Sequence, residues 1–454
     1  MSTSALLLIA LASVVLLLLL VIKAKAHPFV ALLIISLLVA FATGIPADKI
    51  ITTIEKGMGG LLGHIASIII LGSMLGGLIE MSGGAESLAK TLTGVLGAKR
   101  TIAALTIVAF ILGTPVFFEV GFIIIIPLIY GFSKVAHVSP LKFGLPMAGV
   151  MLTVHVALPT HPGAAAAAGI LHSDVGWLML AGIGVSVVVG IVGYFVARFI
   201  NRRHYHLSIN VLEQQQTAEV PDLSVNAQQT RLPPPNALVI GGLIVVPIML
   251  IVSGTLCQAL LLPENAVRQL MTVIGTPPVA LLISLGLASW TLGIRRRMSL
   301  KKLGEVTGSA IPSSADVILV AGAGGAFGGV LVASGIGNAL AEALETIHLP
   351  LMPAAFLLSL VLRASQGSAT VAILTTSGLL SQAVVGLEPL QLVLVTLATC
   401  FGSLGLSHVN DAGFWVVTRY LGLSVPDGLK TWTVLTTIMG VTGFLITWLL
   451  WFAL

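Results

Sequence analysis

Residues 101–132 have the sequence TIAALTIVAFILGTPVFFEVGFIIIIPLIYGF. This run of 32 residues is too long for one upright membrane-spanning helix, which needs about 20 residues, and too short for two complete spans with a turn. Gly113, Thr114 and Pro115 interrupt it at the centre, because glycine and proline disfavour a helix interior. We therefore predict a re-entrant hairpin, in which two half-helices enter the bilayer from one face and meet near its middle.

Three further apolar stretches are interrupted in a similar way. Residues 350–381 match the first stretch in length and carry SQGS at positions 365–368, which predicts a second re-entrant hairpin. Residues 143–169 contain PTHP at 159–162, and residues 390–420 contain SHVND at 407–411. Lipid tolerates an unwound backbone only where it faces protein or a wet cavity, so both are predicted to be broken spans that face the interior.

The composition of the chain indicates lipid as its solvent. Of 454 residues, 57% are hydrophobic and 9% charged, whereas a soluble chain carries about a quarter charged residues. The net charge of +5 does not indicate nucleic-acid binding, because in a membrane chain the placement of Lys and Arg matters more than their sum. Cys257 and Cys400 lie in apolar runs and predict no metal cluster. The uninterrupted spans are predicted at residues 6–22, 28–44, 61–79, 176–200, 237–256, 276–294, 315–332 and 432–452.

The basic residues predict the orientation of these spans. Lys and Arg gather in cytoplasmic loops, and the clusters at 198–203 and 295–302 mark two such loops. Counting outward from them places most of the 22 basic residues inside and both termini outside. Residues 24–26 resemble a signal-peptidase site, but no positive charge precedes the first apolar run, so we expect an uncleaved span.

The predicted elements fall into two halves of the same order. Residues 1–200 and 236–454 each contain three spans, a hairpin, a broken span and a final span, and the polar segment 201–235 joins them in the cytoplasm. Five full crossings in each half invert the second half relative to the first. Gly76-Gly77 and Ser82-Gly83 recur 252 positions later, as Gly328-Gly329 and Ser334-Gly335. The prediction is an all-α polytopic membrane protein of two inverted repeats, with a site where hairpin tips and breaks converge.

An ionisable residue at bilayer depth costs free energy, so each one is a candidate for a structural or functional role. Arg363 could attract an anionic substrate, or it could be a structural partner for Glu119 or Asp411. The segment after it starts a half-helix whose hydroxyls and free N–H groups suit a carboxylate or polyol, or else form a helix contact. The candidates in this segment are Ser365, Gln366, Gly367, Ser368 and Thr370.

Other candidates lie at the first tip and in the two breaks. Glu119 has no basic neighbour in the sequence and could carry a proton, or could be a neutral structural carboxyl. Asp411, with Asn410 and His408, suits either a proton relay or Na⁺ coordination. His161 could bind substrate or satisfy a broken-helix carbonyl, and His155 is expected to be a packing residue. Thr114 and Thr160 complete the candidate substrate ligands.

Enzyme chemistry is not indicated. The sequence contains no Gly-x-Ser-x-Gly elbow, no His-Glu-x-x-His and no Walker loop, and AGAGGAFGG at 321–329 is a helix-packing face in an apolar span. No soluble domain or cofactor motif is present, which predicts gradient-driven or downhill transport without a cofactor. A membrane-embedded enzyme and a passive channel are the alternatives outside the transporter class.

Three strings in this order resemble the gluconate permease family of bacterial inner-membrane sugar-acid symporters, within the ion-transporter superfamily. They are GTPVFFEVGFIIIIPLI at 113–129, QGSATVAIL at 366–374 and LSHVNDAGFW at 406–415, and the resemblance covers essentially the whole chain. The resemblance implies proton-coupled uptake of gluconate-like or related small hydroxy-carboxylates by a homodimer with an elevator-type movement. By motif it assigns functional roles to Glu119, Ser368, Thr370, His408, Asn410 and Asp411.

We therefore expect a secondary active transporter in the bacterial inner membrane that binds an aldonate between the hairpin tips. The driving ion is expected to be H⁺, with Na⁺ as the alternative ion. The rival within the transporter class is a Na⁺-coupled di- or tricarboxylate carrier.

Overall fold

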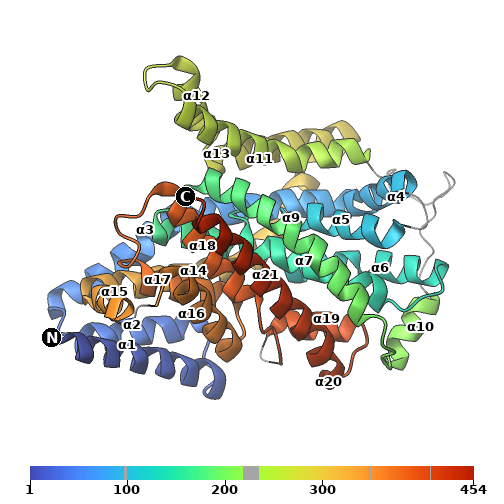
Figure 1. The fold of residues 1–454 in the computed structure, drawn as a ribbon. Coiled ribbons are helices and arrows are strands. Elements are labelled where there is room, and N and C mark those ends of the chain that lie inside the picture. Colours follow the sequence, from blue (N-terminus) through green and yellow to red (C-terminus); the bar gives the residue numbers. More distant parts are fainter. Residues whose placement is uncertain (97–99, 218–234, 347–348, 410) are drawn as a thin grey trace.

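The structure is a computed structural model that describes residues 1–454 except 97–99, 218–234, 347–348 and 410. The described residues form helices joined by turns, with no strand among them (Figure 1). Six of the described helical segments, some of them made of consecutive helices, are long and apolar enough to cross a membrane by length and composition. They are Ala47–Met81, Leu141–Leu171, Val175–Ile200, Ala237–Leu260, Pro277–Arg296 and Val425–Trp451. The predicted class, an all-helical chain of the polytopic membrane type, is confirmed.

The first half of the chain contains nine helices in the described part. They are α1 (Thr3–Leu18), α2 (Pro28–Ala42), α3 (Ala47–Met81), α4 (Gly84–Leu96), α5 (Thr101–Gly113), α6 (Phe118–Val135), α7 (Leu141–Ala157), α8 (Pro162–Leu171) and α9 (Val175–Ile200). A π-helical turn, Leu19–Lys23, extends α1.

The second half repeats this order, with two additional short helices, α12 and α20, inserted between its members. Its helices are α11 (Ala237–Leu260), α12 (Ala266–Ile274), α13 (Pro277–Ala288), α14 (Leu300–Ala333), α15 (Ile336–Thr346), α16 (Leu351–Gln366), α17 (Ala369–Leu380), α18 (Pro389–Leu404), α19 (Ala412–Tyr420), α20 (Val425–Gly428) and α21 (Val434–Trp451). Short π-helical and 3₁₀ pieces, Ser289–Gly293, Ile294–Arg296 and Leu429–Thr433, extend α13 and connect α20 to α21. The added helix α12 has no buried residue and projects at one edge of the molecule (Figure 1).

The long helices α3 and α14 occupy equivalent places in the two halves. They have 35 and 34 residues, and each is followed by a glycine with positive φ, Gly83 at 78° and Gly335 at 77°. Glycine adopts this left-handed conformation without the steric penalty of a Cβ atom. The two glycines are 252 positions apart, the same offset that relates the sequence motifs.

The helices that contain the spans predicted at 61–79 and 315–332 are longer than those spans, because α3 and α14 both begin about 15 residues earlier. At 1.5 Å per residue, α3 is about 52 Å long, well beyond the roughly 30 Å of the hydrocarbon layer. Asp48, Lys49, Glu55 and Lys56 lower the hydropathy of its first turns. These charged side chains end the apolar run, but they do not end α3, because its first turns can extend out of the hydrocarbon layer.

Each interrupted stretch forms two helices with a short segment between them. Residues 114–117 separate α5 from α6, and residues 367–368 separate α16 from α17. Residues 158–161 separate α7 from α8, and residues 405–411 separate α18 from α19. These segments coincide with the Gly-, Pro- and polar-rich centres of the sequence, where few residues favour a helix.

The helices next to these segments form the centre of the molecule. In α7, α8, α17 and α18 nearly every described residue is buried. The largest apolar cluster combines the two halves, since Phe118 and Phe122 of α6 lie in it with Phe401 of α18 and Phe414 of α19. The segment at residues 158–161 is buried throughout, which keeps its free backbone groups away from lipid.

The segment predicted as a polar linker, 201–235, contains a further helix, α10 (Ile209–Thr217). The amide of Ser208 donates to the carbonyl of Gly422 at 2.9 Å. The Gln215 side chain donates to Ser133 Oγ at 3.1 Å and to the Val138 carbonyl at 3.0 Å. The first part of the segment is therefore docked beside the end of α6, while residues 218–234 lie outside the described residues.

Candidate functional site

A cavity of about 220 Å³ lies where three helices begin. The first residues of α6, α17 and α19 line it: Phe118 and Glu119, Ala369 and Thr370, and Ala412 and Gly413. The first turn of a helix presents amides without intrahelical acceptors and the positive end of the helix dipole. Three such ends around one polar space favour an anion.

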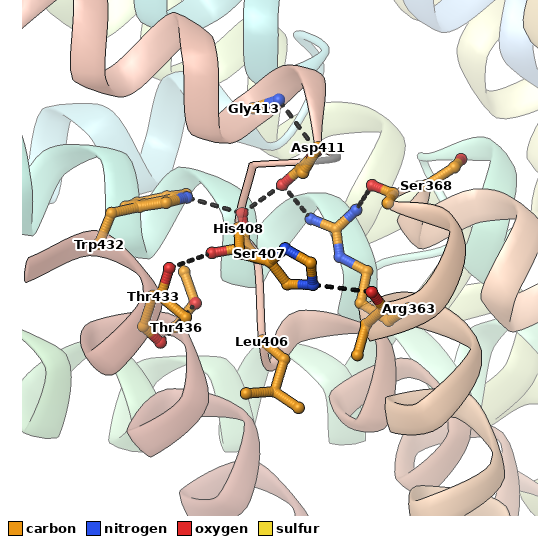
Figure 2. A network of polar contacts seen from close by, with 12 residues as sticks. Arg363, Ser368, Leu406, Ser407, His408, Asp411, Gly413, Trp432, Thr433 and Thr436 are labelled. Carbon is orange, nitrogen blue, oxygen red and sulfur yellow. Dashed lines mark hydrogen bonds and ion pairs between the residues drawn. The ribbon is translucent and has the colours of Figure 1, made fainter. Parts of the chain in front are cut away.

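Arg363 and Asp411 form a buried ion pair at this cavity. Their side chains are 2% and 7% exposed. Arg363 Nη2 donates to Asp411 Oδ2, and Arg363 Nη1 donates to the carbonyl of Gly367 at the α16–α17 turn (Figure 2). The structure thus pairs Arg363 with Asp411 and not with Glu119. The Nε atom of Arg363 is buried and has no hydrogen-bond partner among the described residues.

Asp411 also organises the break between α18 and α19. Its Oδ1 accepts the Gly413 amide at 2.9 Å, which caps α19, and its Oδ2 accepts the hydroxyl of Ser407. Ser407 is held in turn by the indole N–H of Trp432 at 2.7 Å and, at its carbonyl, by the Thr433 hydroxyl at 2.5 Å (Figure 2). The pair and its neighbours therefore fix the unwound segment against two other elements.

Glu119 lies in the first turn of α6 and lines the same cavity. No ion pair joins it to any residue in the described part of the chain. It faces a space that also holds the paired Arg363 and Asp411. Two carboxyl groups line this cavity, those of Glu119 and Asp411. Asp411 pairs with Arg363, whereas Glu119 has no cationic partner among the described residues.

His155, expected to be a packing residue, lines the cavity from the end of α7. Its Nδ1 is buried and has no partner among the described residues. Its ring lies 4.7 Å from the ring of His161 and 6.2 Å from that of Phe117, measured between centroids. The sequence contained one hint of this position, since His155 precedes the first break by about one helical turn.

Three other predicted residues line the cavity, and Thr114, Thr160, His161 and His408 do not. Gly367, Ser368 and Thr370 line it, and the Ser368 hydroxyl caps α17 by accepting the Val371 amide at 3.4 Å. Thr114, Thr160 and His161 are buried beside it without lining it. The Thr114 hydroxyl donates to the Phe110 carbonyl at 3.3 Å, a contact within α5 and its cap.

Both predicted break histidines bind backbone carbonyls. His161 Nε2 lies 2.7 Å from the Gly113 carbonyl oxygen, which is the alternative to substrate binding that the sequence left open. His408 Nε2 lies 2.7 Å from the Ala364 carbonyl oxygen and does not line the cavity. Asn410 lies outside the described residues, as do the side chains of Ser365 and Gln366.

A larger cavity of about 820 Å³ lies among α3, α14 and the start of α9. Glycines such as Gly57 and Gly325 line much of it, and Asp174 is an acidic residue in its wall. Among the residues that the structure describes, no Lys or Arg and none of the predicted site residues line it. The residues suited to an anion meet at the smaller cavity, so we place the candidate site there.

A polar cavity at the meeting point of broken helices, in a chain with several apolar spans, is typical of a polytopic membrane transporter. The same overall fold occurs in the crystal structure of the YdaH transporter of Alcanivorax borkumensis, with a TM-score of 0.59 and 13% sequence identity. That likeness covers 92% of this chain and 98% of the other.

Residues 5–453 match the family model described as GntP family permease, and the chain belongs to this family. It is 61% identical over 451 residues to the inner membrane permease YgbN of Escherichia coli (strain K12), covering 99% of both chains. It is 37% identical over 433 residues to a gluconate permease of Bacillus subtilis (strain 168), covering 93% of this chain and 94% of the other. The resemblance seen in the sequence is confirmed, and the protein is a permease of a family that is not enzymatic.

Proposed function

We propose that the protein is a secondary active transporter that imports gluconate-like sugar acids, aldonates or related small hydroxy-carboxylates, by proton symport across the bacterial inner membrane. The observation that carries the proposal is the cavity of about 220 Å³, which combines three helix starts, the Arg363–Asp411 pair and the unpaired Glu119. The similarity to a gluconate permease supports the substrate class.

The cavity supplies the groups that a sugar acid needs. The substrate carboxylate would lie at the starts of α17 and α19, close to Arg363, where amides and helix dipoles favour negative charge. The hydroxyls of Ser368 and Thr370 would bind substrate hydroxyls. At about 30 Å³ per water molecule, the cavity holds the volume of roughly seven waters, the scale of a small polar solute.

The charges around the cavity supply a reason for proton binding and substrate binding to be coupled. Arg363 and Asp411 neutralise each other, so an ionised Glu119 would leave one net negative charge facing the substrate anion. Protonation of Glu119 would remove that repulsion, and the anion would in turn favour the protonated carboxyl. Linkage makes this effect reciprocal, so substrate and proton would bind together.

The architecture we propose for this function is a pair of inverted repeats, whose hairpins α5–α6 and α16–α17 enter the bilayer from opposite faces. The equivalent order of helices and the matched turns at Gly83 and Gly335 support it. We further propose an elevator-type movement, a homodimer and both termini on the outer side of the membrane, as the family resemblance and the placement of basic residues suggest.

The test is uptake of labelled gluconate into proteoliposomes that contain the purified protein. We expect an imposed pH gradient to drive accumulation above the external concentration in the absence of Na⁺. Unlabelled gluconate and threonate should compete, and citrate and succinate should not. Absolute Na⁺ dependence with competition by citrate or succinate would establish the di- or tricarboxylate alternative, which the comparisons do not support.

A further inference from the structure

We propose that His161 and His408 are a matched pair of positioning residues, each of which holds the turn of one hairpin through a single hydrogen bond. The turns are residues 114–117, between α5 and α6, and residues 367–368, between α16 and α17. The consequence for transport rests on the proposed function, whereas the structural consequence does not depend on it.

The two contacts have the same length and the same chemistry. His161 Nε2 lies 2.7 Å from the carbonyl oxygen of Gly113, the last residue of α5. His408 Nε2 lies 2.7 Å from the carbonyl oxygen of Ala364, in the last turn of α16. The last four carbonyls of a helix have no intrahelical donor, and His161 satisfies that of Gly113 while His408 donates to that of Ala364. In each half, the contact joins a break to the hairpin beside it.

The chemistry of the contact assigns a donor role to each ring. A carbonyl oxygen only accepts hydrogen bonds, so Nε2 carries the hydrogen in both histidines. In a neutral ring Nδ1 then has no hydrogen, which suits His161, whose Nδ1 is buried without a partner among the described residues. The Nδ1 of His155, whose ring lies beside that of His161, is likewise buried without a partner among the described residues. We expect His161 to act as a fixed hydrogen-bond donor to the Gly113 carbonyl.

The positions held by the histidines shape the cavity wall. Turn 114–117 leads directly to Phe118 and Glu119, and turn 367–368 contributes Gly367 and Ser368. The second turn has another support, because Arg363 donates to the carbonyl of Gly367 (Figure 2). Loss of the His161 contact is therefore expected to affect its turn more than loss of the His408 contact affects the second turn.

Hydrogen–deuterium exchange of the purified protein tests the positioning role without any substrate. His161→Ala should speed exchange in peptides covering residues 110–118 and leave residues 362–369 unchanged, and His408→Ala should do the reverse. The Gln variants place an amide donor near the position of Nε2 and should restore slow exchange. The exposed His204 supplies the control, His204→Ala. Exchange that is unchanged at both turns, or raised throughout the protein, would overturn the proposal.

Gluconate uptake by the same variants tests the consequence for transport. We expect the Ala variants to raise KM about tenfold, as loss of one buried hydrogen bond implies, and the Gln variants to keep KM and the pH profile of the wild type. Gln variants that lose proton-driven accumulation while exchange stays slow would show that the histidines carry protons, and would overturn the donor assignment. If an Ala variant fails to fold, the Asn variant replaces it in the comparison with the Gln variant. The amide of Asn is too short to reach the carbonyl oxygen. A wild type that takes up no sugar acid would refute the proposed function, while the exchange data would still decide the positioning role.

Discussion

Arg363 and Asp411 form a buried ion pair that joins the last turn of α16 to the residue that caps α19. The pair links the second hairpin to the second broken span at the wall of the cavity. Moving two charges out of water is expensive, so such a pair persists only where further hydrogen bonds satisfy both groups. The Gly367 carbonyl, the Ser407 hydroxyl and the Gly413 amide supply these bonds.

Asp411→Asn should destabilise the protein strongly, because it leaves the Arg363 charge buried without a counter-charge. The expected loss is about 3–5 kcal/mol in the free energy of unfolding, with loss of uptake. Thermal unfolding of the purified protein measures it, with the exposed Glu264→Gln as control. The double variant with Arg363→Gln should recover part of the loss, since neither charge is then left alone. A melting temperature equal to that of the control would show that the pair contributes nothing to stability.

Glu119→Gln should uncouple transport from the proton gradient, because an amide cannot take up or release the proton. We expect no accumulation of gluconate under an imposed pH gradient, while exchange of internal for external substrate continues. The matched control is Glu80→Gln, since Glu80 is exposed at the end of α3 and distant in sequence from the tips. Unchanged accumulation in Glu119→Gln would remove Glu119 from the coupling step.

Thr370→Val should weaken substrate binding without disturbing the fold, because valine keeps the shape of threonine and loses its hydroxyl. One lost hydrogen bond predicts a KM about fivefold higher. Thr376 is the control, because it lies on the same helix, is buried and does not line the cavity. Equal effects of Thr370→Val and Thr376→Val would count against a substrate contact at Thr370.

Gly57→Ala should force α3 and α14 apart. An added Cβ would lie 2.5 Å from the Gly325 carbonyl oxygen and 3.2 Å from the Ala326 Cα, and backbone atoms cannot move aside as a side chain can. Overpacking of this kind costs about 1–3 kcal/mol. Gly59→Ala, where nothing lies within 4 Å, should leave the melting temperature unchanged or raise it. Equal melting temperatures for the two variants would show that the helices adjust freely.

The sequence predicted the helix breaks well because their causes are local. Gly113 and Pro115 together mark the first break, and the polar residues at 365–368 and 407–411 mark others. A single proline does not suffice, since Pro146 and Pro247 lie inside α7 and α11. The ends of the long helices were harder to predict from the sequence. Asp48 and Lys49 end the apolar run of α3, but hydropathy reports the depth of a segment in lipid and not the length of a helix.

Contacts between distant segments could not be read from the sequence. Arg363 had two acidic candidates of equal merit, Glu119 and Asp411, and nothing local distinguished them. The sequence also did not predict that His155 lines the cavity or that α10 packs beside α6. Each depends on how separate helices approach one another in space.

From its sequence alone, the chain is determined to be a helical membrane protein with four interrupted apolar stretches, since hydropathy and backbone preference act over a few neighbouring residues. The tertiary structure alone decided that Arg363 pairs with Asp411 and leaves Glu119 facing the cavity without a cation from the described residues. The physical reason is that ion pairing depends on the distance between charges, and packing brings together residues 48 positions apart in the chain.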